Sequence, residues 1–166
     1  MMVKSHYKKL KNLYKVLKYN LPLYFEAIDT NNKDLIYSYE HDLFYGKIHG
    51  MSIDTGVCSV KAATMSKPTI EHIFAPQGFA RHIITNLDTE DKFIELTYPL
   101  CYTAKTTSQE NKILSMQQNI PILEKYEQAG IKVYAIDVYD EILGLPQSVK
   151  DLLPKELIEV DKLQLT

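Results

Sequence analysis

The sequence predicts an α+β fold, in which a small mixed sheet packs with helices and follows an N-terminal amphipathic helix. Residues 5–19 have the apolar spacing that is typical of a helix, whereas later runs are short, apolar and bounded by Gly or Pro, as strands are. The two kinds of segment do not alternate regularly, which argues against a parallel βαβ sheet. No repeat or low-complexity linker interrupts the chain, so we expect a single domain over residues 1–166.

Composition excludes several classes of protein. A chain of 166 residues can bury its own core, and its two cysteines are too few for a disulfide framework or a four-thiolate zinc site. No apolar run reaches the roughly 18 residues of a membrane span, and we expect no membrane partner. The N-terminus has no apolar signal core, so we expect a cytoplasmic location. The net charge of −2 gives no nucleic-acid signature, and the sequence does not predict an oligomeric state.

The predicted helix over residues 5–19 is basic. Its apolar stripe is Leu10, Leu13, Tyr14 and Leu17, and Pro22 is expected to end it. The first 25 residues contain six lysines and no acid. Four of them share an arc away from the stripe: Lys8, Lys11, Lys15 and Lys18. This face indicates a solvated surface, a phosphate-binding surface or, third, a contact with an anionic membrane.

The middle of the chain is predicted from turn residues and apolar runs. We expect strands at 23–28, 57–64, 69–74 and 100–105, and residues 34–46 are ambiguous between helix and strand. Pro76 suits the first position of a helix that runs to about residue 87. The acidic run 88–91 predicts a second helix that lasts to about residue 97.

The last third begins with a helix start. Thr107 followed three residues later by Glu110 fits the capping box, so a helix is expected to about residue 119. A helical segment at 121–129 should end at Gly130. Residues 131–138 predict a strand, and the remainder to residue 166 predicts short helical turns and an edge strand.

One segment combines residues with catalytic chemistry. Glu71 and His72 are adjacent in a predicted strand, which places their side chains on opposite faces. Asn111 lies in the first turn of the helix that follows the next predicted strand. Alternatively, His72 is a hydrogen-bonded strand histidine beside a solvated Glu71, and Asn111 is an ordinary polar residue of a first helical turn.

These residues resemble the HNH, or ββα-metal, endonucleases of phages and mobile elements. The resemblance covers residues 69–119, where a strand ending in Glu71-His72 is followed by a second strand and a turn that leads to Asn111. It implies a hydrolase that cuts DNA with Mg²⁺ or Mn²⁺, with Glu71 and Asn111 as metal ligands and His72 as general base. The family's middle residue has only Asn86 as a counterpart, and the stretch 76–99 is longer than the usual spacer.

Other functions are weighed beside this one. Arg81, the only arginine, is either a phosphate ligand, together with the four lysines above, or a surface charge. Asp54 and Lys61 fit part of a PD-(D/E)XK nuclease pattern, but Ser59 stands where that pattern needs an acid. The non-enzymatic alternative is a phage or mobile-element module that binds a host protein, for which the 12 tyrosines would suit an interface or a core equally.

Overall fold

The computed structural model describes residues 4–116, 125–135 and 141–143, and it confirms the α+β class. Contacts divide the chain into two compact units, one of residues 1–51 and 75–101 and the other of residues 52–74 and 102–166. Neither unit is continuous in sequence, which explains why no linker composition marks a boundary. That the two units fold as one domain stays a prediction.

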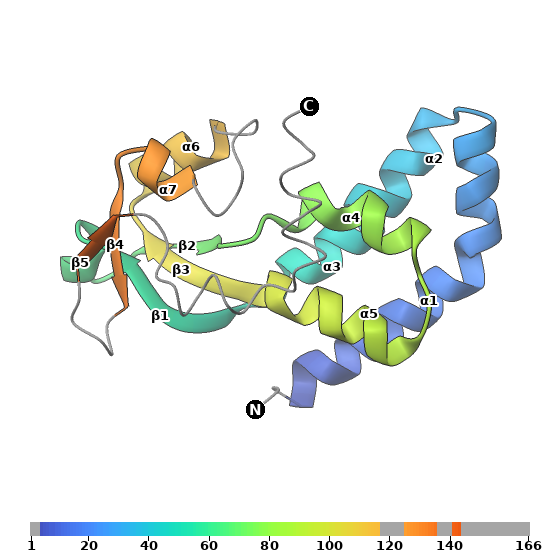
Figure 1. Ribbon diagram of the computed structural model, residues 1–166, viewed down its shortest axis with the longest axis horizontal. Helices are drawn as coiled ribbons and strands as arrows, with labels where there is room; N and C mark the ends of the chain where they lie inside the picture. Colours follow the sequence, from blue (N-terminus) through green and yellow to red (C-terminus); the bar gives the residue numbers. More distant parts are fainter. Residues whose placement is uncertain (1–3, 117–124, 136–140, 144–166) are drawn as a thin grey trace. The chain divides into compact units, whose positions relative to one another are not determined.

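The first unit is helical throughout its described residues (Figure 1). Its elements are α1 (Lys4–Asp29), α2 (Lys33–Tyr37), the π-helix η1 (Ser38–Tyr45), α3 (Gly46–His49), α4 (Pro76–Thr85), α5 (Glu90–Thr97) and the 3₁₀ helix η3 (Tyr98–Cys101).

Helix α1 is longer than the sequence predicts. Leu10, Leu13 and Leu17 are buried as expected, but the helix continues through Pro22 to Asp29. The predicted strand at 23–28 is therefore wrong. Its buried side chains are Tyr24 and Ala27, three residues apart, and they extend the buried stripe of the helix rather than one face of a strand.

The ambiguous segment 34–46 is helical. Asn32 caps α2 by accepting a hydrogen bond from the backbone N–H of Leu35, and the chain then winds through η1 into α3 without a break. Phe44 and Ile48 anchor this stretch in the core. The apolar spacing of this segment does not distinguish helix from strand, because a π-helix shifts the positions that face the core.

The next two helices begin where the sequence predicts. Pro76 occupies the first turn of α4, where its missing N–H has no partner to lose. Thr89 caps α5, its hydroxyl accepting a hydrogen bond of 3.2 Å from the N–H of Lys92. Phe79, Ile83 and Phe93 from these helices are buried in the core of this unit.

The second unit contains the sheet. The strands are β1 (Ile53–Ser59), β2 (Thr69–His72), β3 (Tyr102–Thr106), β4 (Lys132–Ala135) and β5 (Glu141–Leu143). Their order is β2-β3-β1-β4-β5, with β1 and β3 parallel and the other pairs antiparallel. Strand β1 starts earlier than predicted and ends at Ser59, and a bulge between Asp54 and Cys58 includes Gly56 at a φ of 77°.

Helices α6 (Ser108–Met116) and α7 (Lys125–Gln128) belong to the second unit, where α6 contacts β2 and α7 contacts β4. The capping box is confirmed, because Thr107 and Glu110 each bond the other's backbone N–H. Gly130 follows α7 with a φ of 69°, as a helix C-cap favours. The predicted structure at 117–124, 136–140 and 144–166 lies outside the described residues. In the described part of the chain, no helix is long and apolar enough to cross a membrane.

Neighbouring positions on α1 test how the helix docks. Leu17 is buried, whereas Val16 is 43% exposed. We expect Leu17→Ala to lower the free energy of unfolding by about 2–5 kcal/mol, because it leaves a cavity in the core. Val16→Ala, the matched control, should change it by less than about 0.5 kcal/mol. Urea titrations measure both values, and equal effects would mean that α1 does not dock through its leucines.

Candidate functional site

The residues singled out by the resemblance lie on β2, β3 and α6, in the order that it implies. Strand β2 pairs antiparallel with β3, with Glu71 opposite Ala104 and His72 opposite Thr103. Helix α6 follows β3 and packs against β2. The chain between β2 and β3 belongs mostly to the other unit, which accounts for the long spacer in the sequence.

Glu71 is a nearly buried residue bound by α7. The ammonium of Lys125 lies 2.8 Å from Oε1 of Glu71, and the hydroxyl of Tyr126 donates a hydrogen bond of 2.9 Å to Oε2. The side chains of Glu71 and Lys125 are 10% and 7% exposed. Burial, and then the negative charge of Glu71, raise the pKa of Tyr126 well above its usual value. Both carboxylate oxygens of Glu71 therefore have partners within the protein.

A second buried carboxylate belongs to the same unit. Glu110 accepts hydrogen bonds at Oε2 from the hydroxyl of Ser59, at 2.6 Å, and from the N–H of Thr107, at 2.9 Å. Its charge also contributes to the raised pKa of Tyr126. The capping box predicts Glu110 as a helix-start residue. No local sequence pattern predicts its hydrogen bond to Ser59, which lies 51 residues away.

His72 and Asn111 are each half-buried. His72 is adjacent to Glu71 in β2, so the two side chains point to opposite faces of the strand. Asn111 lies in the first turn of α6, and its backbone N–H donates to the carbonyl of Thr107. That Glu71, His72 and Asn111 meet in one pocket stays a prediction.

The donor set around Glu71 does not fit a divalent metal ion. Mg²⁺ and Mn²⁺ favour several oxygen ligands, and such an ion at Glu71 would compete with an ammonium that already holds the same carboxylate. Within residues 4–116, 125–135 and 141–143, no group of three or more His, Cys, Asp or Glu side chains could hold a metal ion. No catalytic step through a metal is therefore derived for these residues.

Asp54, the acid of the partial PD-(D/E)XK pattern, is paired with Lys105. Its carboxylate forms an ion pair of 2.8 Å with Lys105 on β3 and accepts a hydrogen bond from the N–H of Gly56. Burial opposes ionisation of Asp54, but these two contacts outweigh it and lower its pKa. Lys61 is exposed.

The predicted phosphate-binding lysines of α1 have different surroundings. Lys8 and Lys15 are exposed. Lys11 forms an ion pair of 2.7 Å with Glu90 of α5, and Lys18 lies 3.5 Å from the carbonyl oxygen of Asp88. The hydrogen bond to Glu90 raises the pKa of Lys11. Lys8 and Lys15 are thus the members of the predicted set with the most accessible charge.

A row of exposed apolar side chains runs beside these lysines. Tyr19 is 86% exposed, Leu23 51% and Val16 43%. Their spacings of three and four residues place them on one face of α1, distinct from the buried leucine stripe. At about 100° per residue, Lys8 and Lys15 lie on the same side of the helix as Tyr19, with Lys15 about one turn and Lys8 about three turns before it. We call Lys8, Lys15, Val16, Tyr19 and Leu23 the α1 patch.

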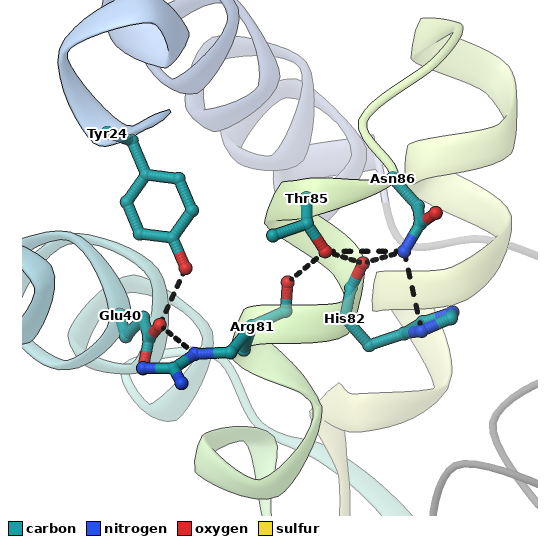
Figure 2. Close-up of polar contacts among 6 residues, drawn as sticks. All are labelled: Tyr24, Glu40, Arg81, His82, Thr85 and Asn86. Carbon is teal, nitrogen blue, oxygen red and sulfur yellow. Dashed lines mark hydrogen bonds and ion pairs between the residues drawn. The ribbon is translucent and has the colours of Figure 1, made fainter. Parts of the chain in front are cut away.

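Arg81 is held by an acid (Figure 2). Its Nε donates to Oε1 of Glu40 at 2.7 Å, and the hydroxyl of Tyr24 donates to the same oxygen at 2.6 Å. Burial and then the bond to Glu40 raise the pKa of Tyr24. The side chain of Arg81 remains 64% exposed. Its predicted contact with phosphate stays a prediction, and the observed contact links η1 to α4.

Asn86, the counterpart proposed for the family's middle residue, is used locally (Figure 2). Its Nδ2 donates to the carbonyl oxygen of His82 at 2.8 Å, one turn back, where α4 ends. This contact closes the C-terminus of the helix.

Comparison with known proteins adds no family to this description. No family model matches the chain, and no curated protein or solved structure is significantly similar to it.

The buried tyrosine beside Glu71 gives a prediction about pH. Because the pKa of Tyr126 is higher in the folded state, its contribution is intact below pH 10 and is lost as the pH rises above 10. Between pH 10 and 11, this loss is about 1 kcal/mol of unfolding free energy, because the unfolded tyrosine is already half ionised at pH 10. The free energy of unfolding of Tyr126→Phe should therefore fall by about that much less than that of the wild type between these two pH values. Urea titrations at both pH values test this, and identical losses would place Tyr126 in contact with water.

Proposed function

We propose that this protein is a non-catalytic binding module that recognises an acidic partner protein through the α1 patch. The observation that carries the proposal is the 86% exposure of Tyr19 between Val16 and Leu23, on the side of α1 that also exposes Lys8 and Lys15. Exposed Leu and Val side chains gain nothing from phosphates, whereas a protein interface buries them. Tyrosine is also enriched in protein interfaces.

The charge of the α1 patch selects the partner's chemistry. Residues 4–25 carry six lysines and no acid, and the first acid of α1 is Glu26. A partner that offers carboxylates beside an apolar strip would match both parts of the patch. An acidic amphipathic helix of a second protein has this chemistry. Nucleic acid matches the lysines, and its bases stack on tyrosine, but it leaves Val16 and Leu23 without an apolar partner.

The metal-dependent nuclease predicted from Glu71, His72 and Asn111 stays the second candidate. The order of β2, β3 and α6 favours it. The pairing of Glu71 with Lys125 and Tyr126 disfavours it, because this acid would have to exchange an internal cation for a metal ion.

Binding to a defined probe tests the proposed interface. We expect a fluorescent acidic amphipathic peptide, with Leu on one face and Glu on the other, to bind the wild type in anisotropy measurements. Tyr19→Ala/Leu23→Ala should weaken binding about tenfold or more, because it removes the apolar centre. Lys8→Ala/Lys15→Ala should weaken binding and reduce its salt dependence.

Met116→Ala is the matched control, because Met116 is 75% exposed but belongs to α6. It should leave peptide binding unchanged. Tight binding of DNA that is insensitive to Tyr19→Ala/Leu23→Ala would contradict the proposal. So would a dimer of the wild type, seen by sedimentation, that the same substitutions dissociate.

An assay of DNA cleavage separates the two candidate functions. We expect no cleavage of single-stranded or duplex DNA by the wild type with Mg²⁺ or Mn²⁺, since Glu71 is held by Lys125. Products should stay at the level of a His72→Ala control. Cleavage that EDTA stops and His72→Ala reduces by the 10²–10⁴-fold typical of a lost general base would establish the nuclease instead.

A further inference from the structure

The buried acid of β2 requires a positive charge beside it. An ionised carboxylate that is removed from water is strongly destabilising unless it is paired and hydrogen-bonded. Glu71 satisfies both conditions through α7, since Lys125 supplies the charge at 2.8 Å and Tyr126 a hydrogen bond at 2.9 Å. The charge balance of this acid is thus complete within the chain.

The neighbourhood increases this need for a cation. Tyr126 is fully buried and senses the charges of both Glu71 and Glu110. Glu110 has hydrogen-bond donors in Ser59 and Thr107, but these are neutral groups. The ammonium of Lys125 is therefore the positive charge that the described contacts bring to Glu71, the carboxylate that shares Tyr126 with it.

The ammonium and a divalent ion exclude each other at Glu71. A divalent ion binds carboxylate oxygen at about 2.0–2.6 Å, and the ammonium nitrogen already lies 2.8 Å from Oε1 of Glu71. Two cations so close in a buried site would repel each other strongly. Lys125 itself is 7% exposed, so it cannot turn into solvent without unpacking α7.

We infer that Lys125 is the resident cation of the β2–β3–α6 core and takes the position that a divalent metal would hold beside Glu71. The core is then independent of metal ions, and Glu71 is a structural partner of α7. Through their contacts with Glu71, Lys125 and Tyr126 tie α7 to β2. This inference concerns the sheet-bearing unit and does not depend on the α1 patch.

A double-mutant cycle tests the pairing. Glu71→Gln and Lys125→Met should each lower the urea midpoint, because each leaves its partner's charge buried and uncompensated. The double variant Glu71→Gln/Lys125→Met should have a higher midpoint than Lys125→Met alone. If Lys125→Met does not fold, recovery of folding in the double variant supports the inference equally. Additive losses would overturn it.

Metal titration of the wild type tests the exclusion. The melting temperature should be the same in EDTA, 1 mM Mg²⁺ and 1 mM Mn²⁺, because no ion displaces Lys125. Lys105→Met is the matched control for Lys125→Met, because it also removes a lysine of this unit but one whose partner, Asp54, is exposed. A rise of several degrees with Mn²⁺ that Glu71→Gln abolishes would overturn the inference.

Discussion

The pairing of Glu71 with Lys125 is the interaction on which the sheet-bearing unit depends. It joins β2 to α7 across 54 residues and places a buried negative charge next to a buried positive one. Neither residue is tolerated alone at such depth, so the segment that carries Lys125 must return to β2 for the unit to fold. The same pairing occupies the acid that the predicted metal-dependent mechanism would use.

The helical unit is organised around α1. One face of this helix is buried through Leu10, Leu13 and Leu17, and another exposes Tyr19 and its neighbours. A helix with a buried and an exposed apolar row has more apolar surface than its own core needs. Lys11 and Lys18 contact residues of the unit itself, whereas Lys8 and Lys15 remain beside the exposed row. This division of roles along one helix supports binding better than catalysis.

Much of the fold could be predicted where the signal is local. Pro76 marks a helix start because its missing N–H costs nothing there, whereas Thr89 and the pair Thr107 and Glu110 do so through hydrogen bonds within one turn. All of these predicted helix starts are confirmed. Pro22 predicts a helix end that the structure does not have, because buried side chains on both sides of it keep α1 helical to Asp29. The π-helix η1 also gave no recognisable period.

The candidate site could be predicted only in part. The sequence identified Glu71 and His72 as neighbours on one strand, and β2 confirms that placement. It could not identify Lys125 or Tyr126, because their partner lies 54 and 55 residues away and the residues around them carry no motif. The exposed apolar row of α1 has no complete signal in the predicted helix 5–19, because Leu23 lies beyond Pro22, where the sequence predicts the end of the helix.

The central claim is that an internal lysine, and not a metal ion, neutralises the acid of β2. The most direct measurement is paramagnetic broadening of backbone amide signals by Mn²⁺ in NMR spectra of the isotopically labelled protein. The account predicts that the signals of Glu71, His72 and Lys125 stay as sharp as those of Leu17 in the helical unit. Selective loss of the Glu71 and Lys125 signals at low Mn²⁺ concentration would contradict it and favour the metal-dependent enzyme.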